Sequence, residues 1–327
     1  MNEWGKVKKV IVGTATGAKY FPDDTGVRHV DYADRRKDAN IPNGEYSQTI
    51  IDEANEDLES LVDIYKEFGS EVVRPTPGDV EHYLYCPRDN ILTVDKKIIA
   101  SPMSLNCRRN EYKYMCNVTD NLVSDADYTD DDYNDDCFMN KNVMALNNHR
   151  PMWDAANILR AGRDILYLSS STANWSGAEQ LQKVLGPNFT VHVLSGVFTF
   201  SHIDSTIALL KPGVALVNPE RIKSKDQLPS VMQNWELIEC PEPIEMGYSS
   251  VEPMMSKWTG MNCVSLDEQT VVVQSTQTNL IKVLEQKGFT VIPVHMRHQR
   301  TFSGGPHCCT VELDREYELE YTFDNKH

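Results

Sequence analysis

The sequence predicts an α/β protein in which similar sheet-and-helix modules repeat around a ring. One pattern recurs along the chain: a strand, a tight turn, a second strand, a helix and a third strand. The turn markers Gly162, Gly213 and Asp267 lie 51 and 54 residues apart, and self-similarity at such a period is typical of toroidal arrays. The N-terminal region supplies a strand, a helix and a strand but no hairpin. Joined to the last strand of the chain, these elements would complete one more module and close the ring.

The N-terminal elements are predicted first. The alternating segment 6–14 (KVKKVIVGT) predicts a strand. Residues 15–43 are rich in Gly, Asp, Pro and Asn, so we expect a long surface loop. Asn43 is a candidate N-cap for a helix over about 45–68, which carries an apolar stripe at helical spacing. A second strand is expected at 71–75.

Four hairpins with their crossovers follow along the chain. Hairpin strands are predicted at 91–94 with 97–100, 155–159 with 165–168, 206–210 with 214–217, and 263–266 with 270–273. Helices at 178–184, 228–233 and 279–286 lead to strands at 190–194, 235–239 and 290–294, and a last strand begins at 310–313. The segment 95–162 is longer than its counterparts, so we expect an insertion there.

Length and composition restrict the class of function. The chain has 327 residues, 40% of them hydrophobic and 24% charged, which is normal for a globular protein with a substantial core. It has no run of about eighteen apolar residues and no apolar leader, so we expect no membrane span, no signal peptide and a cytoplasmic location. The formal net charge of −16 argues against nucleic acid as a partner and fits a small cationic substrate.

Neither cysteine spacing nor acidic residues indicate a metal centre. Eight cysteines are scattered without CxxC pairs, so we expect reduced thiols. The acidic run 125–136 (DADYTDDDYNDD) is expected to be a solvated loop, because it lacks the glycine and terminal glutamate of an EF-hand calcium loop. A zinc site from the histidines and cysteines between 295 and 309 is an alternative, but their spacing matches no common site. We therefore expect no metal.

Polar residues of catalytic type stand just before the first strand of several modules: Asp89, Asp154, His202 with Asp204, and Cys308. In a ring of modules, equivalent strand ends meet near one axis, so these side chains should converge. A thiolate can attack a cationic carbon, an imidazole can move protons, and carboxylates can hold a cation. The stretch 302–313 (FSGGPHCCTVEL) also sets two glycines before Cys308, which permits close backbone approach.

Taken singly, each residue also has a structural interpretation. The aspartates and Ser256 suit turns, His202 suits a satisfied, partly buried position, and Arg221 suits a surface ion pair. Cys308 alone would most often be a small buried apolar residue. The joint pattern favours a catalytic site over these separate explanations.

Six ordered stretches of the chain carry a family resemblance. They are CPRDNILTV (86–94), SPM with RRNEY (101–112), DAANILRAGRDI (154–165), HIDSTIALLKPGVALVNPER (202–221), MSKWTGMN (255–262) and GGPHC (304–308). In order and spacing they resemble the arginine:glycine amidinotransferase family of the guanidino-modifying (pentein) superfamily. The resemblance implies a five-bladed α/β propeller with pseudo-five-fold symmetry, forming one catalytic domain over residues 1–327.

The resemblance also implies the chemistry. Cys308 would be the nucleophile, His202 the general acid and base, and Asp154 an essential carboxylate. The amidino group of L-arginine would pass to Cys308, with release of L-ornithine, and then to an acceptor amine, without a metal or organic cofactor. Glycine, which would give guanidinoacetate, is the default acceptor.

The same resemblance implies how the substrate is held. Asp89 and Asp204 would bind the guanidinium, whose N–H groups pair bidentately with carboxylates. Arg221 and Ser256 would hold the carboxylate and amine end of the amino acid.

The sequence departs from the family pattern at several positions. They are Asn157 for an aspartate, Arg150 for a glutamate, Pro306 for a phenylalanine, residues 199–201 (TFS) for Asn-Pro-Met, and Met255 for a serine. The last two lie beside the expected substrate pocket, so the identity of the acceptor is less certain than the chemistry.

Two other functions compete with amidino transfer. An arginine deiminase or dihydrolase would hydrolyse the same covalent intermediate, and a non-catalytic protein would only bind a guanidino compound. The sequence does not determine the oligomeric state; a homodimer is one candidate.

Overall fold

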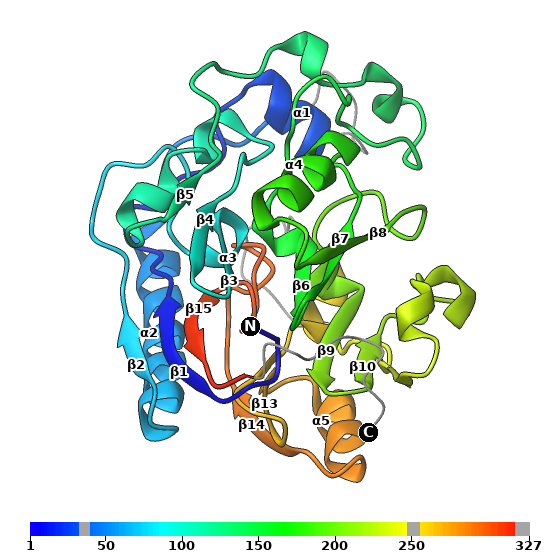
Figure 1. Ribbon diagram of the computed structural model, residues 1–327. Helices are drawn as coiled ribbons and strands as arrows, with labels where there is room; N and C mark the ends of the chain where they lie inside the picture. The colour runs from blue at the N-terminus through cyan, green and yellow to red at the C-terminus, as the bar shows by residue number, and fades with distance from the viewer. Residues whose placement is uncertain (33–39, 247–255, 318–327) are drawn as a thin grey trace.

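The computed structural model describes residues 1–32, 40–246 and 256–317, whose strands form five three-stranded sheets around a common centre (Figure 1). In every sheet the middle strand pairs antiparallel with one neighbour and parallel with the other. Four sheets follow the chain in order: β3 (Ile91–Val94), β4 (Lys97–Ala100) and β5 (Asp120–Asn121); β6 (Ile158–Ala161), β7 (Asp164–Leu168) and β8 (Thr190–Leu194); β9 (Ile207–Lys211), β10 (Val214–Val217) and β11 (Glu236–Glu239); β12 (Val264–Ser265), β13 (Thr270–Gln274) and β14 (Thr290–Val294).

The fifth sheet closes the ring from both ends of the chain. β1 (Val7–Val12) pairs antiparallel with β15 (Thr310–Arg315) and parallel with β2 (Glu71–Val73). The register joins Val12 to Thr310 and Val7 to Arg315. The α/β propeller of five similar modules is therefore confirmed, including the module shared by the two ends.

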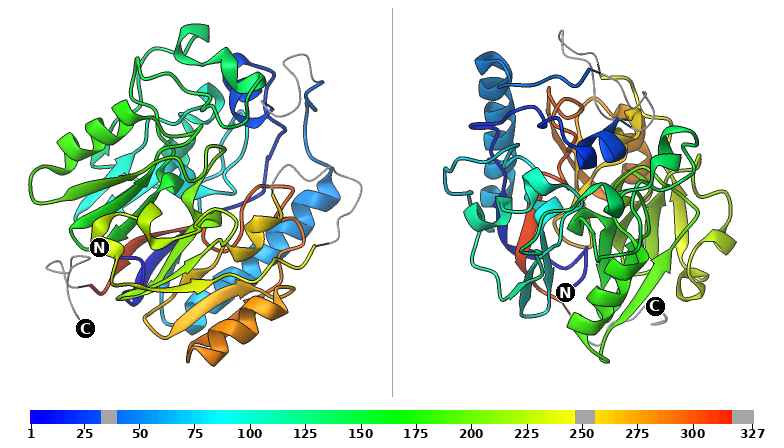
Figure 2. Two further views of the ribbon diagram at one scale, coloured as in Figure 1. Left: turned by 90° about the vertical axis from the view of Figure 1, so that its right-hand side faces the viewer. Right: turned by 90° about the horizontal axis from the view of Figure 1, so that it is seen from above.

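Helices connect the parallel strands in three modules. α2 (Gln48–Glu67), α4 (Trp175–Leu185) and α5 (Thr278–Gln286) each lead from a middle strand to its parallel neighbour, and α2 and α5 lie at the periphery of the ring (Figures 1 and 2). In the other two modules only 3-10 turns make the crossover: η1 (Asn106–Arg108) and η2 (Glu111–Tyr114), and η7 (Lys225–Gln227) and η8 (Ser230–Met232). The short helix predicted at 228–233 is thus present only as the 3-10 helix η8, because Pro229 holds Leu228 in an extended conformation, with ψ of 155°.

Two N-terminal predictions also need correction. α2 is capped by Ser47, whose hydroxyl accepts from the Ile50 N–H, and not by Asn43; Glu45 instead forms a β-bridge with Lys19. The predicted loop 15–43 contains a helix, α1 (Thr25–Asp31), which Asp24 caps. The apolar stripe of α2 is confirmed, since its apolar residues are buried against β1 and β14. No helix within the described ranges is long and apolar enough to cross a bilayer.

Candidate active site

A short helical turn precedes the first strand of four modules, and a tight turn precedes that of the fifth. These turns are α3 (Pro87–Asn90) before β3, η5 (Ala155–Asn157) before β6, η6 (Ile203–Ser205) before β9, η9 (Lys257–Met261) before β12, and residues 306–309 before β15. Neighbouring turns touch: α3 contacts η5, η5 contacts η6, and η6 contacts η9. The strands predicted to begin at Ala155 and Thr206 therefore start a little later, because these turns bend the backbone towards the axis of the ring.

The turns bring the predicted polar residues together. Asp89 lies in α3, Asp154 precedes η5, His202 precedes η6 and Asp204 lies within it, and Cys308 lies in the last turn. We call these five residues the site cluster. They converge although they come from four modules, which is the geometry that equivalent strand ends predict.

His202 stands between two carboxylates. Its Nε2 lies 3.1 Å from Asp154 Oδ2, and its Nδ1 lies 3.6 Å from Asp89 Oδ1. Asp154 is fixed in turn by the backbone N–H and hydroxyl of Ser104, which donate to its Oδ1 over 2.9 and 3.0 Å. The imidazole ring is therefore hydrogen-bonded at Nε2 and within ion-pairing distance of a carboxylate at Nδ1.

Cys308 is buried and held by two neighbours. Its thiol donates to Asp204 Oδ2 over 2.8 Å, and the Asn262 side-chain N–H lies 3.1 Å from its sulfur. The two preceding glycines leave room for the turn: a Cβ on Gly304 would lie 2.3 Å from the Cys86 sulfur, and one on Gly305 would lie 2.9 Å from the Asn262 Cβ. The predicted need for close backbone approach at this turn is confirmed.

The charges of the cluster set its protonation states. Burial alone would lower the pKa of His202, but Asp89 and Asp154 outweigh it and hold that pKa well above its usual value, which favours the imidazolium. The pKa of Cys308 is raised by the neighbouring Cys86 thiol, by burial and by Asp204, and an interaction with His202 opposes these effects. The thiol form is therefore favoured.

Asp89 keeps an oxygen that no protein group satisfies. Its Oδ2 accepts from Arg108 over 2.7 Å, but its buried Oδ1 has no hydrogen-bond donor. Burial raises the pKa of Asp89, against the charges of His202 and Arg108. A buried carboxylate oxygen of this kind suits a ligand that brings its own N–H donors.

Asp31, the last residue of α1, was not among the residues predicted from the sequence. Its buried Oδ2 also has no hydrogen-bond partner. Burial and the charge of Asp154 raise the pKa of Asp31 to about 7. It lies in the segment predicted to be a loop, and no sequence signal marked it.

Other partners of the site cluster lie inside the quoted motifs but were not given roles. Arg108 belongs to RRNEY and pairs with Glu111 as well as Asp89. Asn262 ends MSKWTGMN, and His307 lies in GGPHC. Their place in these motifs was the only sequence signal for these partners. Each forms its contact only in the folded chain, and the sequence does not show such contacts.

The structure does not bring Arg221 and Ser256 into the site cluster. Arg221 Nη1 donates to the Ser205 carbonyl and hydroxyl and to Thr206 Oγ1, and its guanidinium lies 3.5 Å over the Phe198 ring. Burial lowers its pKa to about 10. Arg221 therefore lies beside η6, next to Asp204. Ser256 is exposed, and its hydroxyl caps η9 by accepting from the Trp258 N–H.

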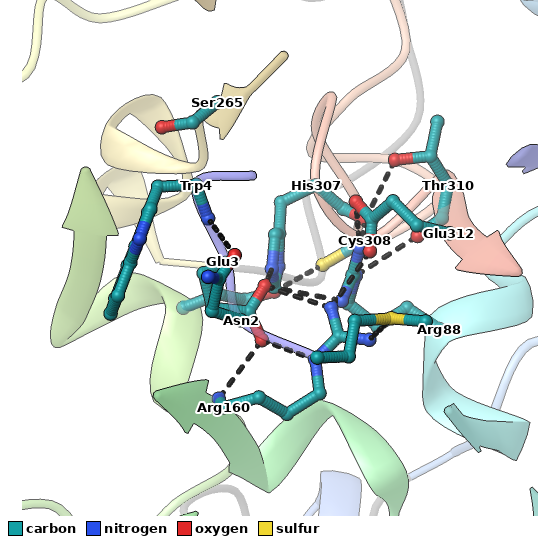
Figure 3. A network of polar contacts seen from close by, with 12 residues as sticks. Asn2, Glu3, Trp4, Arg88, Arg160, Ser265, His307, Cys308, Thr310 and Glu312 are labelled. Carbon is teal, nitrogen blue, oxygen red and sulfur yellow. Dashed lines mark hydrogen bonds and ion pairs between the residues drawn. The ribbon is translucent and has the colours of Figure 1, made fainter. Parts of the chain in front are cut away.

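A second buried polar network lies at the centre of the ring (Figure 3). It consists of Glu3, Arg88, Arg160, Glu312 and Arg315, which we call the hub cluster. Arg160 donates to both oxygens of Glu3 and to Glu312, while Arg88 and Arg315 share the other Glu312 oxygen. Arg88 and Arg160, which lie in motifs that carry the family resemblance, thus belong to the hub cluster.

The structure also shows where the residues of the alternative zinc site and of the acidic run lie. His295 Nδ1 pairs with Ser275 and His298 Nε2 with Glu53, so neither histidine faces Cys308. Within the described ranges, no group of three or more His, Cys, Asp or Glu side chains is arranged to hold a metal. The acidic run is folded into 3-10 turns η3 (Asp130–Asp132) and η4 (Asp135–Phe138) and is not simply a solvated loop.

Two departures from the family pattern have local partners. Arg150 pairs with Asp132 of the acidic run over 2.7 Å. Asn157 donates to Thr172 Oγ1 over 2.8 Å and accepts from the Ser170 hydroxyl. Met255 lies outside the described residues.

Comparison with known proteins gives full-length relatives. The chain is 36% identical over 344 residues to inosamine-phosphate amidinotransferase 1 of Streptomyces griseus, covering 98% of both chains. It is 30% identical to L-arginine:L-lysine amidinotransferase of Pseudomonas savastanoi pv. phaseolicola, covering 97% of this chain and 94% of the relative. It is 31% identical to mitochondrial glycine amidinotransferase of Gallus gallus, covering 99% and 84%.

The chain belongs to the amidinotransferase family. The solved structure of the Streptomyces griseus inosamine-phosphate amidinotransferase superposes with a TM-score of 0.89 at 34% identity, covering 98% of this chain and 97% of that one. DDAH of Pseudomonas aeruginosa shares the fold, with a TM-score of 0.59 at 15% identity over 94% of this chain and 99% of that one. No protein-family model matches the chain. The resemblance to the amidinotransferase family and the pentein superfamily is thus confirmed, and the chain is an amidinotransferase that acts on small molecules.

Proposed function

We propose that this amidinotransferase moves the amidino group of L-arginine to an acceptor amine through a covalent intermediate on Cys308. The observation that carries the proposal is the meeting of one thiol, one imidazolium and three carboxylates in a single buried cluster. These are the groups that nucleophilic attack on a guanidinium carbon requires.

In the first half-reaction, Asp89 and Asp204 hold the guanidinium of arginine. Its positive charge offsets the nearby carboxylates and lowers the pKa of Cys308, so the thiol releases its proton to solvent and becomes the thiolate. The Cys308 sulfur forms a bond to the central guanidinium carbon, and the bond from that carbon to the ornithine nitrogen breaks. His202 gives its proton to the departing nitrogen, so L-ornithine leaves and an amidino group remains on sulfur.

In the second half-reaction, His202 is neutral and acts as a base. It takes a proton from the acceptor amine, whose nitrogen attacks the amidino carbon and displaces the Cys308 sulfur. Asp154 holds the His202 ring in place through the 3.1 Å hydrogen bond. Arg221 and Ser256 remain proposed contacts for the amino-acid end of the substrate.

Glycine is the default acceptor in this proposal. The names of the relatives add inosamine phosphate and L-lysine as acceptors to be tested. The residues that differ from the family pattern at 199–201 lie just before His202, so they are suited to altering the acceptor.

The decisive experiment is a screen of amines against L-arginine, with ornithine release as the readout. Turnover that requires an added amine is expected. Citrulline, or ornithine with ammonia, formed from arginine alone would instead support a deiminase or dihydrolase.

Mass spectrometry tests the intermediate directly. Wild-type protein mixed with arginine alone should carry one amidino group on Cys308, and Cys308→Ser should carry none and lose turnover by at least about a thousandfold. Near-normal turnover of Cys308→Ser or of His202→Asn would reject the assigned roles.

A further inference from the structure

His307, next to the candidate nucleophile, lies between the site cluster and the hub cluster. Its Nδ1 lies 3.2 Å from Asp204 Oδ2, and its Nε2 lies 3.8 Å from Glu3 Oε2 (Figure 3). The ring is buried, and the rest of the residue is pinned: its N–H donates to Asn262, and its carbonyl accepts from Arg88 Nε over 2.9 Å. The imidazole is therefore a side-chain contact that joins the two networks.

The Glu3 side of this contact has room for solvent. A cavity of about 10 Å³ is lined by Glu3, Asp204, His307 and Ser265 among others, which is about the space of one water molecule. Glu3 itself is fixed by two hydrogen bonds from the Arg160 guanidinium. Glu3 thus presents a stationary negative charge to His307 Nε2.

The two carboxylates determine which protonation state of the His307 ring fits between them. A neutral imidazole donates from one nitrogen and accepts at the other, so one of its nitrogens would point a lone pair at an acidic oxygen. Asp204 lies within hydrogen-bonding distance of the ring and Glu3 within ion-pairing distance, so both negative charges favour the imidazolium. Arg88 donates to the backbone carbonyl of His307 and also lies 3.9 Å from Glu3 Oε2.

The effect of His307 on Asp204 is opposite to that of burial. Burial favours the neutral acid, but the hydrogen bond and charge of His307, with further help from His202 and Cys308, lower the pKa of Asp204 to about 2. Both the His307 and the Cys308 hydrogen bonds go to Oδ2, and no other hydrogen bond in the described part of the chain reaches Asp204. Its Oδ1 therefore keeps its lone pairs.

We propose that His307 is a positioning residue for the arginine half-reaction: as a cation held by Glu3, it keeps Asp204 ionised and reserves Asp204 Oδ1 for the guanidinium of the donor. The inference rests on the proposed function. Without this cation, burial would favour the neutral acid of Asp204, and a protonated Asp204 would lose its charge-assisted pairing with the substrate.

Kinetics on three variants test the role. In His307→Leu, kcat/KM for arginine should fall about 10–100-fold, and the acid limb of its pH profile should move up by about one unit or more. His307→Asn keeps a donor near Asp204 but not the charge, so it should recover part of the loss. Glu3→Gln should move the acid limb in the same direction by less. The KM of the acceptor amine should stay within about twofold in all three.

His192→Asn is the matched control. His192 also pairs with an aspartate, Asp164, over 2.6 Å, but it lies in β8 outside the site cluster. Its substitution should leave the pH profile unchanged. An unchanged acid limb and arginine kcat/KM in a folded His307→Leu would overturn the proposal.

A measurement on the unaltered protein separates this inference from the proposed function. Nitrogen-15 spectra of histidine-labelled wild-type protein report the protonation of both His307 ring nitrogens, with the signal assigned by its loss in His307→Asn. Both nitrogens should carry protons at pH 7.5, and a neutral ring there would reject the inference even if amidino transfer is real. If the ring is charged but arginine releases no ornithine with any amine, the proposed function fails instead.

Discussion

Two buried polar networks of this amidinotransferase differ in how completely they are paired. In the hub cluster, all four carboxylate oxygens of Glu3 and Glu312 accept from arginine N–H groups, although the buried Arg315 Nε–H has no acceptor. In the site cluster, Asp89 Oδ1 has no donor, and the pKa values of His202 and Cys308 are raised. Both networks are largely buried, although His202 is 12% exposed, and they differ mainly in how far their charges are paired. A network whose carboxylate oxygens are all paired holds the modules together. A network with an unpaired carboxylate oxygen can bind a cation.

The largest effect should come from breaking the hub cluster. Glu312→Ala leaves Arg88, Arg160 and Arg315 without their shared partner, and removing one member of a buried charge network costs about 3–5 kcal/mol of unfolding free energy. Chemical denaturation measures it. The matched control Glu59→Ala removes an exposed partner of Arg74 and should cost less than about 1 kcal/mol. If both substitutions lowered the unfolding free energy equally, the hub cluster would stabilise the protein no more than a surface ion pair does.

Asp89→Asn should affect activity rather than stability. The amide keeps the shape of the side chain but loses the charge that pairs with guanidinium, so kcat/KM for arginine should fall about 10–100-fold. Because burial raises the pKa of Asp89, its ionised form costs stability at neutral pH, and the variant should unfold at a temperature close to that of wild type. Asp120→Asn in the same module is the control. A large loss of stability with normal arginine kinetics would place Asp89 in a structural network.

The smallest predicted effect concerns Asp31. Its pKa is raised from 3.8 to about 7, first by burial and then by Asp154, so its stabilising contribution is fully present below pH 3.8 and is lost as the pH rises from there to about 7. Relative to wild type, Asp31→Asn should therefore gain roughly 1 kcal/mol or more of unfolding free energy at pH 8 but not at pH 3. The exposed Asp63→Asn should show no such difference. The same shift for both variants would mean that the Asp31 carboxyl is ordinary.

The fold could largely be predicted because its signals are local and repeated. The turns at Gly162, Gly213 and Asp267 recur at 51 and 54 residues, and the hairpin strands 206–210 and 214–217 are visible as two apolar runs. Errors came where local preferences compete. Asn43 and Ser47 are both good capping residues, and only the β-bridge of Glu45 with Lys19 decides between them.

The site could be predicted only in part. The family resemblance marked Cys308, His202 and Asp154, and the structure brings these residues together. Their partners Asn262, Ser104 and His307 lay within or beside known motifs, but a hydrogen bond between modules leaves no spacing in the sequence. Asp31 was missed because a single aspartate at the end of a short helix resembles any surface residue.

The sequence by itself determined the order of the modules, the residues of the strands and the presence of a thiol, an imidazole and carboxylates at equivalent strand ends. Only the tertiary structure decided which of these groups touch, which oxygens stay unpaired, and how far each pKa moves. The physical reason is that strand and turn preferences act over a few neighbouring residues, whereas hydrogen bonding and charge interactions depend on distance and burial, which exist only once the ring is closed.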